Sequence, residues 1–591
     1  MWNHTSRTRG PPTPPAPARV KLNFFHLPPS PPAALPTWLR PAILALAAIL
    51  LMACFSTKVA DSDTWLHLET GKYVAQHHRI PNPDPFSFTT YLGKPLPGEE
   101  TVRSFNLTHS WLGQTIVYLA YAAGGFGGMV LLRAFLMTAF CALAWLWTWR
   151  RSQSFYRALA AAFVSGFIAS YFSSDRPYQI TYVMIAATIL ILEYRRSMWL
   201  LPPLFLFWAN CHGGFFMGFV VLGTYGAESL WQRLRDKPGK PAPGERRLWL
   251  VTTVCVPAAF LNPNGFLALY ILLAYHQSSL TSTIYEWQKP PLWPPSFLNL
   301  LLLGAVAVLV WQRRRTRLVD WLLLGLFGAA YLSAVRNSNL VGLVAPALIA
   351  SYLPWKRILP PWTEWAAALL LMSALAVPFA RGRAFQLRYA EWKYPAGAAD
   401  FLLAHHIAQP MFHSFEKGGY LVWRCWPEER SFIDGRGLNE TAFADYQRIV
   451  KYLPGTPELL DRYGIQVVVM NAFEASSGST YVLPLALADP AEKEWKIVLA
   501  DAGAAVFMHH PPPGVQPLPP ARIFASMEEQ CQAILDHDPA RPRCARSLAN
   551  LFRNTRDAGR ARRWMGLYLD HRPDRNPADD AFYQQLPAAG Q

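Results

Sequence analysis

Apolar residues in the first two thirds of the chain gather in long runs separated by short basic stretches. Such runs predict membrane-crossing helices, because a span needs about 20 apolar residues and fewer where flanking residues reach the interface. The pattern therefore predicts a polytopic α-helical membrane protein. About eleven spans are expected, at 41–57, 129–149, 158–173, 180–194, 198–210, 214–230, 248–261, 297–312, 319–335, 339–354 and 361–380.

Two further apolar pieces, 111–123 and 266–275, are too short for a span and fit interfacial or re-entrant elements. If both crossed the membrane, the segments between them would change sides. Arg150, Arg195 and the basic loop 233–247 would then face outward, against the preference of Lys and Arg for the cytoplasmic side.

The distribution of positive charge predicts the orientation. With the N-terminus inside, 22 Lys and Arg residues up to residue 360 fall on the inner side and 8 on the outer side. An odd number of spans then places everything after about residue 381 outside the cytoplasm.

Composition agrees with a membrane protein. The chain is 52% hydrophobic and only 16% charged, whereas soluble proteins carry about 25% charged residues. A net charge of +17 would suit a nucleic-acid partner, but the basic residues punctuate the apolar runs instead of forming a binding face. No nucleic-acid partner is therefore expected.

The two ends of the chain differ from the apolar middle. Residues 1–39 are Pro-rich, basic and free of acids, which is typical of a disordered cytoplasmic arm. Residues 385–510 read as a small α/β domain: a helix, a turn at Gly464 and a strand come first, and a strand pair follows within 496–510. Residues 511–520, "PPPGVQPLPP", predict a stiff linker.

The tail, residues 521–591, resembles a tetratricopeptide helix pair. "LDHDPARPR" at 535–543 recurs as "LDHRPDRNP" at 569–577, a shift of 34 residues. One such unit cannot bury its own apolar face, so we expect it to dock on the α/β domain or on an envelope protein partner. Of seven cysteines, Cys531 and Cys544 could pair in an oxidising compartment, and no zinc-type spacing occurs.

Polar motifs converge on the outer face that the charge count defines. Polar groups at membrane depth are costly and persist mainly where they line a pathway or a site. A functional site is therefore predicted where the following segments meet: "DSD" (61–63), "DRPYQ" (175–179), "NCH" (210–212), "NPNG" (262–265), "YEW" (285–287) and "RN" (336–337).

The acids come directly after the first apolar run. Asp63 suits the N-cap of a short helix 64–70 closed by Gly71, a purely structural role. A partly desolvated carboxylate at that position would also have a raised pKa, which suits a general base. His67 lies one turn later on the same face. Asp63 and His67 could share a divalent cation, but two ligands are too few to predict a metal site.

The cations have two interpretations each. Arg176 and Arg336 could pair with Asp175 or reach the interface, or they could hold a phosphate, which the planar guanidinium suits. Asn337 follows Arg336 directly and joins it as a candidate binding residue.

The remaining candidates are equally open. Asn210 and His212 could bind an anionic head group, or they could belong to a helix break at the two glycines that follow. Glu286 beside Trp287 could be a second acid or part of a sugar-stacking platform. Asp434 and Arg436 read as a tight-turn pair in preference to a sugar contact.

The motifs resemble those of C-type, membrane-embedded glycosyltransferases, and more narrowly a group of bacterial multispan proteins of that type. The resemblance covers roughly residues 40–510. It rests on "DTWLHL" (63–68), "DPFS" (84–87), "HSWLGQTIVYLAY" (109–121), "NCHG" (210–213), "NPNG" (262–265), "GGY" (418–420) and "DGR" (434–436).

This resemblance implies a function. Enzymes of this type move a sugar from a polyprenyl-phosphate carrier to a lipid, glycan or protein acceptor at the outer face, usually with inversion. Their essential acid follows the first span, which matches Asp61 or Asp63. Both are therefore candidates for the catalytic acid, and the register with Trp65 and His67 favours Asp63. We expect Asp63 to act as the base, with Trp65 holding the loop at the interface and His67 orienting the carboxylate or a water. The expected location is the bacterial cytoplasmic membrane.

Two other function classes fit the sequence. A lipid or polysaccharide transporter should carry charges in the middle of its spans, whereas the polar motifs here gather at one face. A non-catalytic scaffold would use the helical tail to recruit envelope proteins. Activity that depends on Asp63 would separate the enzyme from the scaffold.

Overall fold

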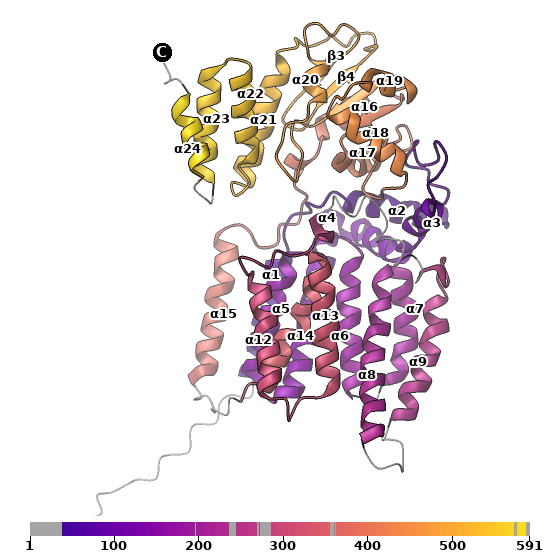
Figure 1. Cartoon of the computed structure of the whole chain (residues 1–591), viewed down its shortest axis with the longest axis vertical. Helices are drawn as coiled ribbons and strands as arrows, with labels where there is room; N and C mark the ends of the chain where they lie inside the picture. Colours follow the sequence, from indigo (N-terminus) through magenta and orange to yellow (C-terminus); the bar gives the residue numbers. More distant parts are fainter. Residues whose placement is uncertain are drawn as a thin grey trace, which may run out of the picture.

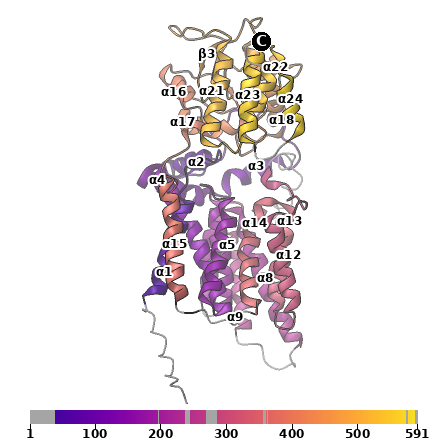
Figure 2. The same cartoon turned by 90° about the vertical axis from the view of Figure 1, so that its left-hand side faces the viewer.

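The computed structural model is mainly helical and contains one small mixed sheet (Figure 1). It describes residues 38–194, 197–235, 244–268, 271, 285–354, 360, 362–572 and 576–586. A bundle of long helices forms one part, and a sheet domain with the C-terminal helices is stacked on one end of it (Figures 1 and 2). We call that end of the bundle the proximal end and the opposite end the distal end. The predicted arm, 1–39, lies almost wholly outside the described residues.

A helix lies in each of the eleven predicted stretches. These helices are α1 Leu39–Phe55, α4 Trp111–Ser152, α5 Phe155–Ser170, α6 Tyr178–Tyr194, α7 Leu201–Cys211 after the 3-10 turn η1 Met198–Leu200, α8 Phe216–Arg235 after η2 Gly213–Phe215, α9 Glu245–Phe260, α12 Phe297–Trp311, α13 Leu318–Ser333, α14 Ser338–Tyr352 and α15 Trp362–Ala380. Two short 3-10 turns, η4 Tyr285–Trp287 and η5 Val335–Asn337, precede α12 and α14.

Two helical stretches of the described chain are long and apolar enough to cross a membrane. They are Glu99–Ser152 and Trp362–Ala380, and the other apolar helices of the bundle are shorter. Two of the eleven expected spans, 129–149 and 361–380, therefore lie in helices that have the length and the apolar composition to cross a membrane.

The first predicted interfacial piece is part of a longer helix. Residues 111–123 and 129–149 both belong to α4, which is interrupted by the non-helical backbone of Gly124 and Gly125. Gly125 has φ +58, a conformation that glycine adopts without strain. The second piece, 266–275, lies largely outside the described residues.

The helix after the acidic loop, α2 Thr64–His77, is longer than predicted. It continues through Gly71 and ends at His78, which is left-handed with φ 52. Gly71 is therefore not a helix stop. A Cβ built on Gly71 would lie 2.2 Å from the carbonyl oxygen of Gln114, so the missing side chain lets α2 cross α4 closely.

Trp65 is a core residue and not an interfacial one. Its side chain is fully buried, and four aromatic rings meet it edge-on at centroid distances of 4.8–5.6 Å. Such edge-to-face pairs stabilise beyond simple area burial. The four rings come from the bundle and from the sheet domain: Phe126, Tyr389, Tyr394 and Tyr420. Trp65 therefore joins α2 to both parts of the molecule.

The sheet domain follows α15. Its four strands have the order β1-β2-β4-β3, with β1 parallel to β2 and the other two pairs antiparallel. The predicted helix, turn and strand around Gly464 and the predicted strand pair are present. The elements are η6 Glu391–Lys393, α16 Ala396–Ala404, β1 Met411–His413, η7 Phe415–Lys417, α17 Gly418–Cys425, α18 Glu440–Val450, α19 Thr456–Arg462, β2 Val467–Met470, α20 Leu483–Leu487, β3 Lys496–Ala500 and β4 Ala505–Met508.

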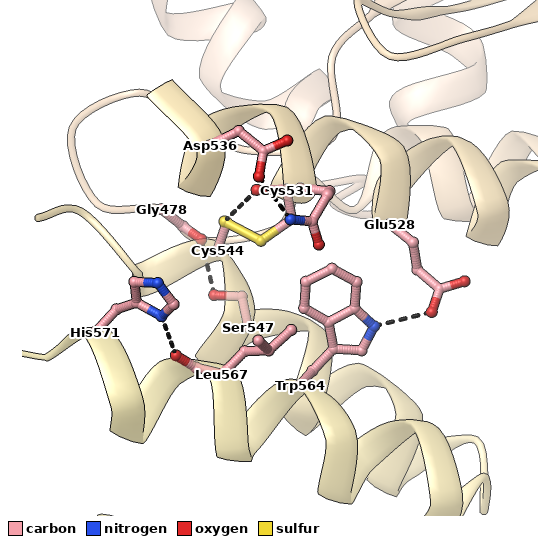
Figure 3. Close-up of a disulfide and its surroundings, with 10 residues drawn as sticks. Gly478, Glu528, Cys531, Asp536, Cys544, Ser547, Trp564, Leu567 and His571 are labelled. Atoms are coloured by element: carbon pink, nitrogen blue, oxygen red, sulfur yellow. Dashed lines mark hydrogen bonds between the residues drawn. A yellow bond between two sulfur atoms is a disulfide. The ribbon is translucent and has the colours of Figure 1, made fainter. Parts of the chain in front are cut away.

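The tail packs on the sheet domain through a shared apolar core. Its helices are α21 Arg522–His537, α22 Arg543–Asn554, α23 Ala558–His571 and α24 Pro577–Gln585. A disulfide joins Cys531 on α21 to Cys544 on α22, and beside it the Trp564 indole N–H donates to Glu528 at 2.8 Å (Figure 3). The predicted linker also contacts β3, since the Leu518 N–H donates to the Ile497 carbonyl at 2.7 Å.

A charged network ties the distal ends of the helices together. Arg151 at the end of α4 binds Asp320 at the start of α13 through two hydrogen bonds of 2.6 and 2.8 Å, and Arg317 pairs with Glu193 of α6 at 2.5 Å. The Tyr352 hydroxyl of α14 also donates to Asp320. The charges are largely buried and paired with one another. Removing one partner would leave the other charge unpaired in the apolar interior, which destabilises the fold.

The crossing of α2 and α4 gives a first prediction. Gly71→Ala should destabilise the protein by about 1–3 kcal/mol, the usual effect of overpacking, because backbone atoms of α4 cannot yield like a flexible side chain. Thermal unfolding in detergent measures the loss. Gly223→Ala is the matched control, since Gly223 is also helical and nothing lies within 4 Å of its built Cβ. Equal melting temperatures for both variants would contradict the close crossing.

Candidate active site at the proximal end

Arg176 lies between the two acids of the "DSD" loop. Its guanidinium contacts Asp61 Oδ1 at 2.6 Å and Asp63 Oδ2 at 3.0 Å. Asp61 also accepts the backbone N–H of Asp63 at 2.9 Å, which fixes the loop. The predicted pairing of Arg176 with Asp175 does not occur, because Asp175 binds Arg133 of α4 at 2.7 Å.

Asp63 occupies the N-cap position of α2 without capping it. Its side chain makes no hydrogen bond to the first turn of the helix. The carboxylate is instead turned toward Arg176, and 30% of the side chain stays exposed. The structural role that the sequence suggested for this carboxylate is therefore absent.

The two acids have pKa values that are shifted in opposite directions. Burial would raise the pKa of Asp61, but the charge and hydrogen bond of Arg176 outweigh it and hold the pKa below the usual value. For Asp63 burial dominates over the attraction of Arg176, and the charges of Asp61, Glu286 and Asp434 add to it, so the pKa rises to about 6. Asp61 is therefore held in its ionised form, whereas the carboxyl group of Asp63 changes its protonation state closer to neutral pH.

A second arginine continues this charge array. Glu286 lies 3.9 Å from Arg176 and 3.6 Å from Arg336, so it stands between the two cations. The Arg336 guanidinium lies 4.3 Å from the centre of the Trp287 ring, a cation–π contact. Trp287 is thus a platform for Arg336, and Glu286 links both arginines to the acidic loop.

His67 faces a different neighbour from the one expected. Its Nδ1 lies 3.1 Å from the side-chain nitrogen of Gln114 on α4. Burial, followed by the charge of Arg176, lowers the pKa of His67 to about 3, so the ring is neutral. His67 therefore does not orient the Asp63 carboxylate through a hydrogen bond.

Three further candidates hold backbone or helix ends. Asn210 accepts the Trp111 indole N–H at 2.9 Å and donates to the carbonyls of Leu206 and Leu261. Asn337 donates to the Ala330 carbonyl at the end of α13. His212 begins η2, as the predicted helix break implied, and its Nδ1 accepts the Gly214 N–H at 3.0 Å. Asn210 and Asn337 thus shape the fold around the site.

The "DGR" turn of the sheet domain lies against the side chain of Asp63. A Cβ built on Gly435 would lie 2.2 Å from Asp63 Oδ1, so any side chain at this position would displace the Asp63 carboxylate. Arg436 binds Asp434 at 2.5 Å and Asp84 of the "DPFS" segment at 2.8 Å. The tight-turn pairing of Asp434 with Arg436 is confirmed.

The sequence gives no sign that Asp84 and Gly435 belong to this site. They lie in the separate motifs "DPFS" and "DGR", and chain order does not indicate that these motifs meet beside Asp63.

An open groove lies at the C-terminal end of α2, and its lining includes none of the acids and arginines of the charge array. Its volume is about 540 Å³, and the ends of α2, α4, α7 and α9 surround it. The lining is largely apolar and includes Val74, Ile80, Trp111, Phe260 and Leu261, with Arg79 among them. Within the described residues, no group of three His, Cys, Asp or Glu side chains is placed to hold a metal ion.

The opposite pKa shifts of the two acids give a second prediction. Asp63→Asn should be at least as stable as the wild type at pH 7. Folded wild-type protein binds more protons at Asp63 than unfolded protein does between pH 3.8 and about 6, so its free energy of unfolding falls as pH rises through that window. The advantage of the variant should therefore shrink as pH drops from 6 toward 4. Thermal unfolding in detergent across this range is the measurement.

Asp61→Asn is the matched comparison and should behave oppositely. The pKa of Asp61 is lowered in the folded state, so its ionised form stabilises the fold at neutral pH and that contribution is lost on acidification. An Asp61→Asn protein as stable as the wild type at pH 7 would contradict this assignment of the two acids.

Comparison with known proteins assigns the chain to no family. No protein-family model matches the chain, and no curated protein matches it. A function for the chain is therefore inferred from the geometry and charge of the acidic loop, the two arginines and the turn at Gly435.

Proposed function

We propose that the chain is a membrane glycosyltransferase that moves a sugar from a polyprenyl-phosphate carrier to an acceptor hydroxyl. In this reaction the bond between the sugar C1 and the phosphate oxygen breaks, and a bond from the acceptor oxygen to C1 forms. The polyprenyl phosphate leaves with the bonding electrons, and Asp63 takes the acceptor's proton. The "DTWLHL" segment resembles that of C-type glycosyltransferases, which indicates this reaction. The observation that supports it best is the raised pKa of the partly exposed Asp63 carboxylate.

Asp63 has the properties that a general base needs. Its pKa is raised to about 6, its carboxylate is partly exposed, and it makes no capping bond that proton transfer would break. A base works best when its pKa lies near the operating pH. Asp61, with its lowered pKa and its bond to Arg176, suits the supporting role of keeping that arginine in place.

The donor phosphate is assigned to the two arginines. Arg176 is already engaged by both acids, whereas Arg336 has an ion contact at 3.6 Å and a ring beneath it. A phosphate binding to Arg336 would gain charge-assisted hydrogen bonds that Glu286 does not fully supply. The open groove at the C-terminal end of α2, with its apolar side chains, is proposed for isoprene units of the carrier farther from the phosphate.

The proposal includes a multi-pass position in the bacterial cytoplasmic membrane. About eleven spans, an inner N-terminus and an outer C-terminus would place the proximal end, with the acids, at the outer face. Two observations support this orientation. The Cys531–Cys544 disulfide fits an oxidising compartment around the tail. The distal end is rich in arginine, as the cytoplasmic ends of spans are.

The proposed acceptor and partners meet the protein on its outer surface. A lipid, glycan or protein acceptor fits an open site at the membrane surface. The tail keeps its proposed tetratricopeptide-like character, but its apolar face is used on the sheet domain, so an envelope protein partner would bind its outer surface. A divalent cation is not part of the proposed reaction.

Charges in the bundle favour an enzyme over a transporter. The buried ion pairs of the described bundle lie near the proximal end, as with Arg133 and Asp175, or at the distal end, as with Arg151 and Asp320. A transport path would need polar groups between these layers. The scaffold alternative requires no ionisable Asp63 and is tested by the same variant as the enzyme.

Asp63→Asn tests the reaction directly. The amide keeps the size of the side chain and removes its basicity, so sugar transfer should fall by about 10²–10⁴-fold, the usual contribution of general base catalysis. The assay follows labelled sugar leaving polyprenyl-phosphate hexose and pentose donors in vesicles of bacterial membrane lipid. Binding of bare polyprenyl phosphate should persist, which shows that the variant is folded.

Asp400→Asn is the control for this experiment. Asp400 is also paired with an arginine, Arg424, at 2.5 Å, but it lies in the sheet domain and is mostly exposed. Its substitution should leave transfer unchanged. Near-normal transfer by a folded Asp63→Asn protein would overturn the assignment of the base.

Arg336→Ala tests the phosphate site. Loss of one hydrogen-bonded cation should weaken binding of bare polyprenyl phosphate by about 1.5–3 kcal/mol. Arg176 is a poorer test because its removal also leaves Asp61 and Asp63 without a counter-charge. Binding is measured by titration in detergent, with Arg424→Ala in the sheet domain as control. Unchanged affinity in Arg336→Ala would return Arg336 to a structural role.

A further inference from the structure

Two histidines from distant parts of the chain meet beside the charge array. His109 lies between α3 Glu99–Thr108 and α4, and His212 lies between α7 and η2. Their ring centroids are 6.1 Å apart. Gly213 lies beside this contact: a Cβ built on it would be at ordinary contact distance, 3.5 Å, from Cδ2 of His109 and at a tight 3.1 Å from the ring of Phe105.

Hydrogen bonds fix the two rings in opposite tautomers. His109 Nδ1 lies 2.9 Å from the Phe105 carbonyl, which can only accept, so Nδ1 carries the proton and Nε2 presents a lone pair. His212 Nδ1 accepts the Gly214 N–H at 3.0 Å, so its proton is on Nε2. The pair therefore presents one acceptor and one donor. Neither Nε2 has a hydrogen-bond partner in the described part of the chain.

The pair adjoins the residues of the proposed reaction. His212 Nδ1 also lies 2.9 Å from the Thr181 hydroxyl in the first turn of α6, a helix that begins two residues after Arg176. In the same turn, the Tyr182 hydroxyl donates to the backbone carbonyl of Arg336 at 3.3 Å. Both arginines assigned to the donor phosphate are thus tied to the helix turn against which His212 packs.

A hydroxyl group matches this pair better than a phosphate does. An ionised phosphate oxygen can only accept, so it would satisfy His212 but face the lone pair of His109. A hydroxyl accepts from His212 and donates to His109. Adjacent hydroxyls on a sugar ring offer the same combination, and they would lie next to a phosphate held by the two arginines.

We propose that His109 and His212 form a subsite that binds hydroxyl groups of the carrier-linked sugar. This inference rests on the proposed function and deepens it. It assigns carrier binding to two separate parts, with the arginines holding the phosphate and the histidines distinguishing a sugar-bearing carrier from a bare one. Asn210, which the sequence paired with His212, is instead occupied by Trp111 and backbone carbonyls.

Asparagine substitutions separate the binding role from the structural one. In His109→Asn the amide N–H can still donate to the Phe105 carbonyl, and in His212→Asn the amide oxygen can still accept the Gly214 N–H. Each variant loses the Nε2 position together with a ring contact, to Phe105 for His109 and to Tyr178 for His212. The control is His405→Asn, because His405 also bonds the carbonyl four residues earlier, at 2.9 Å, and its ring lies 4.3 Å from the ring of the same residue type, Phe401, in a tilted contact.

The experiment compares binding of bare polyprenyl phosphate with binding of polyprenyl phosphates that carry glucose, mannose or arabinose, using the full chain in detergent. Each histidine variant should bind the preferred sugar-bearing carrier about 3- to 10-fold more weakly, the effect of one neutral hydrogen bond. Affinity for bare polyprenyl phosphate should be unchanged, and His405→Asn should match the wild type throughout.

The other outcomes are equally decisive. Equal weakening for bare and sugar-bearing carriers would assign the histidines to the phosphate and overturn the subsite, as would no weakening at all, while the proposed function would stand. If the wild type binds none of these carriers, the proposed function fails and the subsite fails with it.

Discussion

The arrangement of the site depends on one arginine shared by two carboxylates. Arg176 is close to both Asp61 and Asp63, but it does not serve them equally: the shorter contact and the fixed loop geometry favour Asp61. One cation cannot fully compensate two partly desolvated anions, so one acid keeps its charge and the other holds its proton more tightly. The pKa values of two neighbouring carboxylates are thereby pushed apart, an arrangement that enzymes use to make one of them a base near neutral pH.

The sheet domain completes this arrangement and does not merely cover it. Trp65, two residues after Asp63, is held by aromatic rings from both parts of the molecule. Gly435 brings the turn of Asp434 and Arg436 against the Asp63 carboxylate, and Arg436 extends to Asp84 in the loop after α2. The environment that raises the pKa of Asp63 therefore includes groups more than 300 residues away in the chain, and a displaced sheet domain would change it.

Buried charge at the two ends of the bundle has different uses. At the distal end, Arg151, Arg317, Glu193 and Asp320 satisfy one another with short contacts, which suits a structural clasp. At the proximal end the contacts to Glu286 are longer, and a guanidinium and two imidazole nitrogens keep hydrogen-bonding capacity. Unused capacity of this kind is what a polar ligand requires, and it lies at the end of the bundle that carries the sheet domain.

The sequence by itself determined where the bundle helices lie along the chain, because a long apolar run favours a helix independently of the contacts that the rest of the chain makes. It also indicated the candidate acids Asp61 and Asp63 and the candidate arginines Arg176 and Arg336. The strand pair within 496–510 and the turn at Asp434 were likewise predictable from the sequence. It did not determine which groups pair. Arg176 binds Asp61 and Asp63 instead of its neighbour Asp175, Trp65 is a core residue, and Gly71 allows a helix crossing in place of a helix end. Those outcomes depend on contacts between residues far apart in the chain, and hydropathy and spacing carry no information about such contacts. Only the tertiary structure brought His109 to His212 and Gly435 to Asp63, and with them decided which carboxylate is free to accept a proton.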